Sequence, residues 1–178
     1  RHCEQVALKK RKAYQAENYW GKPVPPFGDA QAQLLVVGLA PGAHGANRTG
    51  RVFTGDRSGE WLYRALWKAG FANQPQSHSL DDGLSLLGAR VTCVVKCAPP
   101  DNKPTPTEVK RCSSKYLKRE ITEKNQIQVF LALGKLAWDE LQKILVEGTP
   151  RKPFAHGAVL SLPNGRWLVG SYHPDRKS

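Results

Sequence analysis

Short, continuous runs of apolar residues recur along the chain, separated by polar segments. Runs of this length bounded by turn residues are typical of strands buried on both faces of a sheet. We therefore predict five strands, at Gln33 to Leu39, Arg90 to Lys96, Ile127 to Leu133, Ala158 to Leu162 and Trp167 to Ser171. Pro163-Asn164-Gly165 predicts a hairpin turn between the last two.

Between these runs, apolar residues follow helical spacing. The first such segment has Ser58 as its expected N-cap and ends at Gly70. Residues 105–108 form a strong helix start, and that helix should run to about Glu123. A further helix is expected at residues 135–146.

The other segments are rich in turn residues. Residues 72–88 predict a loop with room for one short helix. Ala98 to Pro104 predicts an irregular loop, because its prolines exclude regular structure. Residues 1–20 are basic and helix-prone. The prolines at 23, 25 and 26 stop any helix, and Phe27-Gly28-Asp29 should continue an exposed linker.

Strands that alternate with helices predict a three-layer α/β/α sandwich around a mostly parallel central sheet. We expect one domain over residues 1–178. Ligands bind outside the carboxyl ends of the strands in such folds. The candidate site therefore lies in the loops after residues 39, 96 and 171.

Charge points to a polyanionic partner. The chain has 27 Lys and Arg against 15 Asp and Glu, a formal net charge of +12, which favours DNA or RNA through phosphate contacts. Apolar residues make up 40%, too many for a disordered chain. No apolar run suits a membrane span or a signal peptide, so we expect a cytoplasmic, nucleoid-associated monomer.

The loop after the first strand, Gly38 to Arg51, is rich in glycine but is neither a Rossmann fingerprint nor a phosphate-binding loop. Phe53 and Asp56 follow it. Phe53 is placed to stack on a planar base and Asp56 to act as a base or an electrostatic stabiliser. The alternative, a core Phe53 and a helix-capping Asp56, stays equally open from the residues alone.

Several loop segments together resemble the uracil-DNA glycosylase superfamily, nearest to its type-B (family 5) branch. Gly38 to Arg51 with Phe53-Thr54-Gly55-Asp56 resembles the first motif of that branch. The matching segments that follow are Lys96-Cys97-Ala98-Pro99-Pro100-Asp101-Asn102-Lys103-Pro104, Leu133-Gly134-Lys135-Leu136-Ala137 and Ser171-Tyr172-His173-Pro174. The likeness covers nearly the whole chain.

The resemblance implies a monofunctional DNA glycosylase. Such an enzyme hydrolyses the N-glycosidic bond of uracil and other deaminated bases flipped out of single- or double-stranded DNA, and leaves an abasic site. It assigns catalytic roles to Asp56, His173 and Asn102. The expected substrate-binding residues are Gly38, Ala40, Pro41, Gly42, Phe53 and Cys93.

The resemblance also implies a [4Fe-4S] cluster. Cys3, Cys97 and Cys112 match three of its four ligands, and the first ligand would lie upstream of Arg1. The chain is therefore expected to be truncated at both ends. From the residues alone, the choices for the cysteines are buried small side chains, a metal site or redox chemistry, and three scattered cysteines indicate a metal only weakly.

Two departures concern the substrate and the C-terminus. Family 4 relatives carry an amide where this chain has Cys93 and an acidic residue at Ala40, and both changes favour the type-B branch with its broader range of bases. The family continues His-Pro with a serine and later an asparagine, whereas Asp175 to Ser178 follow here. We expect this change to alter the segment that wedges into the duplex.

Other polar residues receive plainer assignments. We expect His44 and Asn47 to hydrogen-bond within the first loop, and Arg48 and Arg51 to meet phosphate. His156 is expected to be structural, and Lys9 to Lys12 a solvated helix face. The rival hypotheses are a non-catalytic nucleic-acid-binding module, an iron-sulfur or zinc protein, and a nucleotide-phosphate enzyme.

Overall fold

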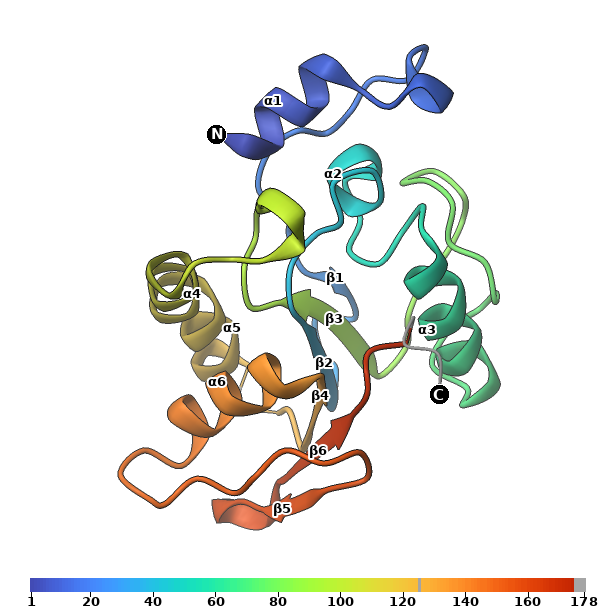
Figure 1. Cartoon of the computed structure of the whole chain (residues 1–178). Coiled ribbons are helices and arrows are strands. Elements are labelled where there is room, and N and C mark those ends of the chain that lie inside the picture. Colours follow the sequence, from blue (N-terminus) through green and yellow to red (C-terminus); the bar gives the residue numbers. More distant parts are fainter. Residues whose placement is uncertain (125, 175–178) are drawn as a thin grey trace.

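A six-stranded sheet runs through the middle of the molecule in the computed structural model, which describes residues 1–124 and 126–174 (Figure 1). The strand order is β1-β3-β2-β4-β6-β5. The bounds of β1 to β6 are Phe27–Gly28, Leu34–Gly38, Ala89–Cys93, Val129–Leu133, Val159–Ser161 and Trp167–Ser171. The four inner strands run parallel, while β1 and β5 pair antiparallel at the edges, which confirms the mostly parallel sheet.

Helices cover both faces of this sheet. The bounds of α1 to α6 are His2–Lys9, Ala46–Thr49, Arg57–Lys68, Pro106–Cys112, Lys118–Glu123 and Lys135–Leu145. Helices α4, α5 and α6 lie on one face and α3 on the other, which confirms the three-layer sandwich (Figure 1). Among the described residues, no helix is long and apolar enough to cross a membrane.

Two hydrophobic clusters fill the spaces between the layers. Alternate residues of β2 point to opposite faces, so Leu35 and Val37 join the cluster under α4 to α6, and Val36 joins the one under α3. The largest side chain of the first cluster is Trp138, and Tyr63 is fully buried in the second. Each such burial contributes about 1.5–3 kcal/mol.

The helix predicted from residue 105 begins as expected. Thr105 and Glu108 form a reciprocal capping box, which satisfies backbone groups at the start of α4. A π-helical turn, Ser113–Leu117, joins α4 to α5, so the helical path reaches Glu123 as predicted. The predicted third helix and the hairpin around residues 163–165 are also present.

The exposed linker predicted at Phe27-Gly28-Asp29 is wrong. Phe27 pairs with Val91 as part of β1, and its half-buried ring lies 4.5 Å from the Arg51 guanidinium. A two-residue edge strand is too short to produce any periodic pattern. Only His2–Lys9 of the first twenty residues is α-helical, with a 3₁₀ turn at Lys12–Tyr14.

The strand predicted to reach Lys96 ends at Cys93. The chain turns here because Lys96 is buried and its ammonium donates to the Thr92 hydroxyl at 2.6 Å and the Cys93 carbonyl at 2.7 Å. The same ammonium pairs with Glu120 on α5 at 2.6 Å. This buried ion pair, which the sequence analysis missed, fixes the start of the loop after β3 against the helical layer.

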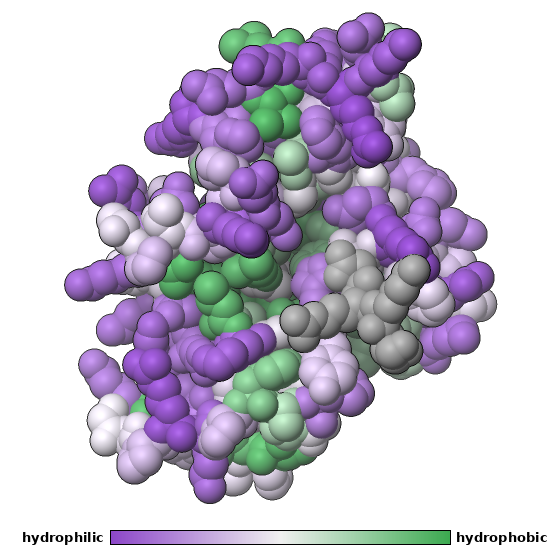
Figure 2. All heavy atoms as spheres, in the orientation of Figure 1, coloured by the Kyte–Doolittle hydropathy of each residue, from purple (hydrophilic) through white to green (hydrophobic). Residues whose placement is uncertain are grey.

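Hydrophilic side chains cover most of one face of the molecule, and apolar ones gather toward its middle and lower part (Figure 2).

Residues 72–88 form the predicted loop, without the short helix for which they had room. One isolated bridge, Ala72 to Leu86, closes that loop.

Candidate active site

The loops after β2, β3 and β6 meet around one cavity of about 230 Å³. Its lining residues are Ala40, Gly42, Phe53, Asp56, Arg57, Ser58, Asn102 and His173. The three loops were predicted to converge because parallel strands present their carboxyl ends at one edge. A wider groove of about 750 Å³ lies between α4 and α6 and is lined by none of the predicted site residues.

Phe53 forms one wall of this cavity and is 7% exposed. Its backbone is left-handed, with φ of 51°, a conformation that is strained for an aromatic residue. Two glycines make room for it: a Cβ on Gly38 would lie 2.5 Å from the Phe53 ring, and one on Gly59 would lie 1.8 Å from its carbonyl oxygen. The ring thus belongs to the core and also faces the cavity.

The two carboxylate oxygens of Asp56 make different contacts. Its Oδ1 accepts from the Gly59 N–H at 3.0 Å and the Ser58 hydroxyl at 2.8 Å, so Asp56, and not Ser58 as predicted, is the N-cap of α3. Its Oδ2 lies against Gly42 and Gly45, where a Cβ would come within 3.0 and 2.2 Å. The carboxylate is held rigidly at the cavity by the start of a helix.

Asn102 reaches the cavity from the proline-rich loop. Asp101 and Asn102 both have positive φ, 51° and 54°, within the turn Pro100–Asn102. Asparagine and aspartate tolerate this backbone better than other residues that have a side chain. The sharp turn brings Asn102 to the cavity that Asp56 also lines.

His173 follows β6 and packs its ring against Phe53, with 5.8 Å between the ring centroids. His156 holds the preceding residue: its Nδ1 accepts the Tyr172 N–H at 3.2 Å, and the two rings stack at 4.8 Å. This contact agrees with the structural role predicted for His156. The altered segment predicted at Asp175 to Ser178 lies outside the described residues.

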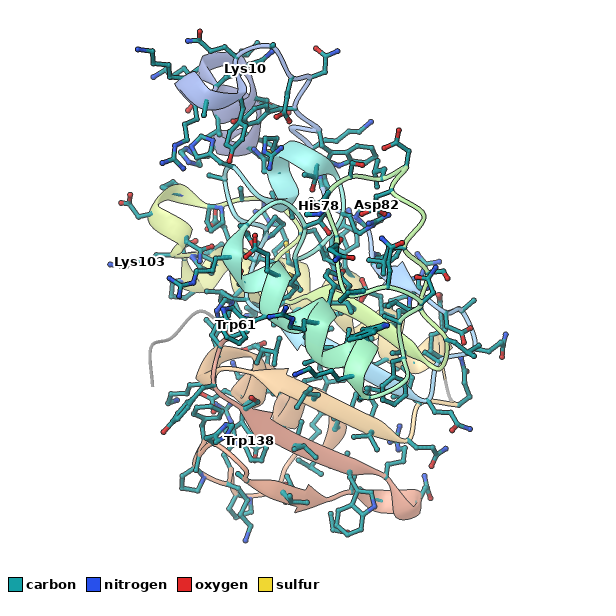
Figure 3. The ribbon with its side chains drawn as sticks, turned by 90° about the vertical axis from the view of Figure 1, so that its right-hand side faces the viewer. Lys10, Trp61, His78, Asp82, Lys103 and Trp138 are labelled. Atoms are coloured by element: carbon teal, nitrogen blue, oxygen red, sulfur yellow. The ribbon has the colours of Figure 1, made fainter. Side chains whose placement is uncertain are left out.

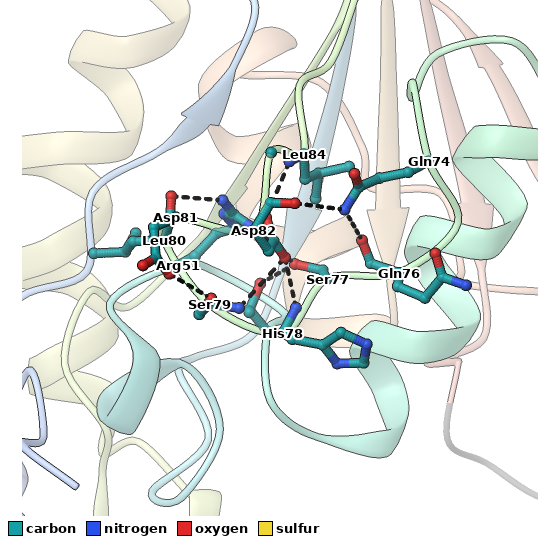
Figure 4. Close-up of polar contacts among 12 residues, drawn as sticks. Arg51, Gln74, Gln76, Ser77, His78, Ser79, Leu80, Asp81, Asp82 and Leu84 are labelled. Carbon is teal, nitrogen blue, oxygen red and sulfur yellow. Dashed lines mark hydrogen bonds and ion pairs between the residues drawn. The ribbon is translucent and has the colours of Figure 1, made fainter.

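A buried polar network braces the loop that carries Phe53 (Figure 4). Arg51 is 3% exposed and pairs with Asp82 at 2.9 Å. Its guanidinium also donates to the Ser77 hydroxyl at 3.1 Å and the Leu80 carbonyl at 3.2 Å. Ser77 in turn lies 2.6 Å from the Thr54 hydroxyl. The prediction that Arg51 meets phosphate is wrong, because its charge is neutralised inside the protein.

Arg48 is also held internally. It pairs with Glu17 at 2.7 Å and donates to the carbonyls of His44 and Gly55, and its side chain is 11% exposed. The phosphate role predicted for it is therefore not supported. The His44 ring bonds to the Tyr19 hydroxyl at 2.9 Å, and its carbonyl accepts from Arg48 within the loop. Asn47 donates to the Ala43 carbonyl within the loop and to the Cys3 carbonyl.

Three predicted substrate-binding residues do not line the cavity. Gly38 and Cys93 lie beyond the Phe53 ring, with the Cys93 Sγ 3.6 Å from a Cβ built on Gly38. Burial raises the pKa of the Cys93 thiol to about 12. Pro41 is buried beside the lining residues Ala40 and Gly42. Their substrate roles stay predictions.

Arg57 and Ser58 line the cavity and were not predicted to do so. Both lie in the first turn of α3, directly after Asp56. The sequence contained a signal for this, because residues in the first turn of a helix lie next to its N-cap, and Asp56 was already a predicted site residue.

Cys3, Cys97 and Cys112 line a separate cavity of about 410 Å³, reached from α1, the loop after β3 and the end of α4. Burial raises the pKa of Cys97 to about 11, and the neighbouring thiols of Cys3 and Cys112 add to this. Within residues 1–124 and 126–174, no group of three or more His, Cys, Asp or Glu is arranged to hold a single metal ion. Cysteine thiolates are the ligands that hold iron-sulfur clusters, so these three residues are the candidate ligands of the cluster that the family resemblance implies.

The model of the uracil DNA glycosylase superfamily matches residues 25–178. This chain belongs to that superfamily. A relative from Thermus thermophilus, named type-5 uracil-DNA glycosylase, is 47% identical over 178 residues, which cover 98% of this chain and 78% of the relative. The predicted type-B (family 5) branch is thereby confirmed.

Two further relatives show the range of the likeness. The type-5 uracil-DNA glycosylase of Mycobacterium tuberculosis is 46% identical over 176 residues, and this chain spans 66% of its length. The type-4 uracil-DNA glycosylase of Archaeoglobus fulgidus is 32% identical over 136 residues, which cover 76% of this chain and 56% of that protein.

Proposed function

We propose that this protein is a monofunctional DNA glycosylase that removes uracil and other deaminated bases from DNA. The observation that carries this proposal is the meeting of Phe53, Asp56, Asn102 and His173 around one cavity of about 230 Å³. That volume is below the range typical of drug-sized ligands, and a single nucleobase is a smaller ligand. The net charge of +12 suits the phosphates that flank such a base.

Binding of the base begins with its removal from the helical stack. Phe53 offers a fixed aromatic face for the flipped base, and Ala40 and Gly42 bring backbone to the edge of the cavity. The positive φ of Phe53 and the two glycines packed on it hold the ring in place before the substrate arrives. A rigid pocket of this kind lowers the cost of binding.

Cleavage breaks the bond between the base nitrogen and C1′ of the sugar, and the electron pair leaves with the base. His173 donates a hydrogen bond to the base carbonyl oxygen where negative charge develops. Asp56 stabilises the oxocarbenium-like sugar or accepts a proton from the attacking water, whose oxygen bonds to C1′. Asn102 orients that water. The products are the free base and an abasic site.

A Schiff-base step is not part of this mechanism. Among the described residues, no lysine lines the cavity, so nothing there supplies an amine nucleophile. The strand therefore stays intact after the base is released.

The range of bases follows from what the pocket lacks. Ala40 lines the cavity and its side chain has no polar group to reject an altered base. Cys93, which lies beyond the Phe53 ring, cannot supply the paired donor and acceptor of an amide there. We infer a site that accepts several deaminated bases, uracil and hypoxanthine among them.

A [4Fe-4S] cluster is the second part of the proposal. Cys3, Cys97 and Cys112 would hold it, with the fourth ligand that the family resemblance places upstream of Arg1. Bound there, the cluster would tie α1 to α4 and to the loop that carries Asn102. Iron and acid-labile sulfide content, measured on the full natural chain purified without oxygen, tests this independently of activity.

The activity is tested by free-base release from duplex oligonucleotides, each with one uracil, hypoxanthine, xanthine or thymine opposite guanine. Undamaged duplex of the same sequence is the control. We expect uracil release and alkali-labile abasic sites. Binding without release of any of these bases would favour the non-catalytic DNA-binding alternative and overturn the proposal.

A further inference from the structure

The outward face of α3 carries three cations and one tryptophan in a single stripe. Arg57, Trp61, Arg64 and Lys68 are all exposed. At 3.6 residues per turn they lie within about 60° of one another around the helix axis. Their spacing of four, three and four residues therefore makes a continuous line along the helix, which we call the α3 stripe.

Trp61 is unusual for its exposure. It is 53% exposed and borders a hollow of about 240 Å³. The hollow is lined by Glu60, Trp61, Arg64, Pro75, Gln76, Ser77 and His78. An open aromatic face beside amide and imidazole groups fits a planar ligand that also forms hydrogen bonds.

The cations of the stripe are available to a ligand. Among the described residues, no carboxylate forms an ion pair with Arg57, Arg64 or Lys68. This contrasts with Arg48 and Arg51, whose charges are neutralised inside the protein.

The stripe continues from the catalytic cavity. Arg57, its first member, is also a lining residue of that cavity. Trp61 extends from α3, on the side of the molecule that faces the viewer in Figure 3. From Arg57 to Lys68 the helix rises about 16 Å, roughly the length of five nucleotides along one strand of a duplex.

We propose that the α3 stripe is a second nucleic-acid contact site, which holds the strand next to the flipped nucleotide. Its cations bind successive phosphates, and Trp61 stacks on one unpaired base seated in the adjoining hollow. The inference rests on the proposed function, since it needs a nucleotide in the catalytic cavity. It also predicts a preference for lesions beside unpaired nucleotides, because stacking on Trp61 requires a base that has left its own stack.

The test compares Trp61→Ala with Trp67→Ala. Trp67 is a matched control because it lies on the same helix, is 45% exposed and points about a quarter turn away from the stripe. Both changes are made in Asp56→Asn protein to prevent turnover. The dissociation constant for a fluorescent single strand with a central uracil is then measured by anisotropy.

We expect Trp61→Ala to weaken binding by about 5- to 150-fold, the range for loss of one base-aromatic stack. Trp67→Ala should change it by less than about twofold. Arg64→Gln should reduce the slope of log K against log salt by about 0.7, while Trp61→Ala leaves that slope unchanged. Equal binding by the two tryptophan variants, with unchanged melting curves, overturns the inference.

Shortening the oligonucleotide separates this inference from the proposed function. Removing five nucleotides from one side of the uracil should abolish the difference between the tryptophan variants, and removing them from the other side should not. If protein with the natural Asp56 releases uracil but Trp61 has no effect on binding, only the stripe is wrong. If Trp61 matters for binding but no lesion base is released, the proposed enzymatic function fails.

Discussion

The catalytic cavity and the cysteine cavity share one loop but are held together in different ways. The loop after β3 gives Asn102 to the first and Cys97 to the second, five residues apart. At the catalytic cavity, two polar groups are fixed by partners inside the protein: Asp56 caps α3, and Arg51, which braces the loop that carries Phe53, pairs with Asp82. Around the cysteine cavity, burial and the neighbouring thiols of Cys3 and Cys112 raise the pKa of Cys97.

The folded chain itself holds the catalytic residues in place, whereas the cysteines would be held in place by a bound metal centre. In the first cavity, hydrogen bonds and glycine contacts fix Asp56 and Phe53 once the protein folds. In the second, the high pKa of Cys97 keeps a neutral thiol, and binding of a metal centre would have to displace that proton.

Asp56→Asn should abolish base release while leaving the fold intact. Asparagine caps a helix as well as aspartate, so α3 keeps its start, but the charge that faces the sugar is lost. We expect the single-turnover rate of uracil release to fall about 10²- to 10⁴-fold. DNA affinity and the melting temperature should hardly change.

Ser58→Ala is the control for this change, because it removes one hydrogen bond to Asp56 and keeps the carboxylate. It should cost far less activity. Equal losses in the two variants, or unfolding of Asp56→Asn, would mean that Asp56 acts mainly through the helix cap.

Arg51→Met should destabilise the protein without touching the substrate. It leaves Asp82 partly buried without its cation, and breaking a buried pair costs about 3–5 kcal/mol. Urea unfolding measures the loss. Arg51→Met combined with Asp82→Asn should recover part of it, since the unpaired charge is gone; a loss below about 1 kcal/mol for the single variant contradicts the bracing role of Arg51.

Cys112→Ala should separate the two cavities. In the full natural chain we expect iron content to fall severalfold and the melting temperature to drop, because the proposed cluster loses a ligand. Excision should suffer less than in Asp56→Asn, since Asn102 is affected only through its loop. Cys93→Ala is the matched control: it removes a buried thiol outside the cysteine cavity and should keep its iron. Equal iron in both variants would reject the cluster.

The place of the site in these loops could be predicted from the sequence because their residue types are unusual for ordinary loops. Glycines at 38 and 42, an aromatic at 53 and a carboxylate at 56 follow a buried strand, and parallel strands end at one edge. The residues alone could not assign Asp56 to one role. The structure shows that it caps α3 and also lines the cavity, and its catalytic role stays a prediction. The choice between cap and catalytic group was never exclusive, since the capping carboxylate points one oxygen at the cavity wall.

Three of the failures, at Arg48, Arg51 and Lys96, share one cause: the sequence shows that a residue is charged but not whether it is buried. Arginines in a glycine-rich loop are typical phosphate contacts. Here Glu17 neutralises Arg48 and Asp82 neutralises Arg51, and the two members of each pair are 31 residues apart in the sequence. The strand predicted to reach Lys96 ends earlier because Lys96 is buried and pairs with Glu120 of the helical layer. Pairings of this kind depend on tertiary structure, and local pattern does not contain them.

The smallest predicted effect concerns acid stability and comes from the same network. Burial alone would raise the pKa of Asp82, but hydrogen bonds from the His78 and Leu84 N–H groups and from Arg51 outweigh it and lower the pKa to about 2. A carboxyl whose pKa is lowered by folding stabilises the protein fully above its unfolded pKa of 3.8. That contribution is lost as the pH falls from about 4 toward 2.

The stability difference between the natural protein and Asp82→Asn should therefore be constant near neutral pH and shrink by on the order of 1 kcal/mol below pH 4. Urea midpoints from pH 6 to pH 2 measure it. Asp81→Asn is the control, because exposed Asp81 bonds only to the Ser79 hydroxyl among the described residues and lies outside the pair with Arg51. A difference that stays constant down to pH 2 would show that the hydrogen bonds to Asp82 do not discriminate between its charged and neutral forms. The bracing of the catalytic loop would then rest on packing around Arg51 and not on its charge.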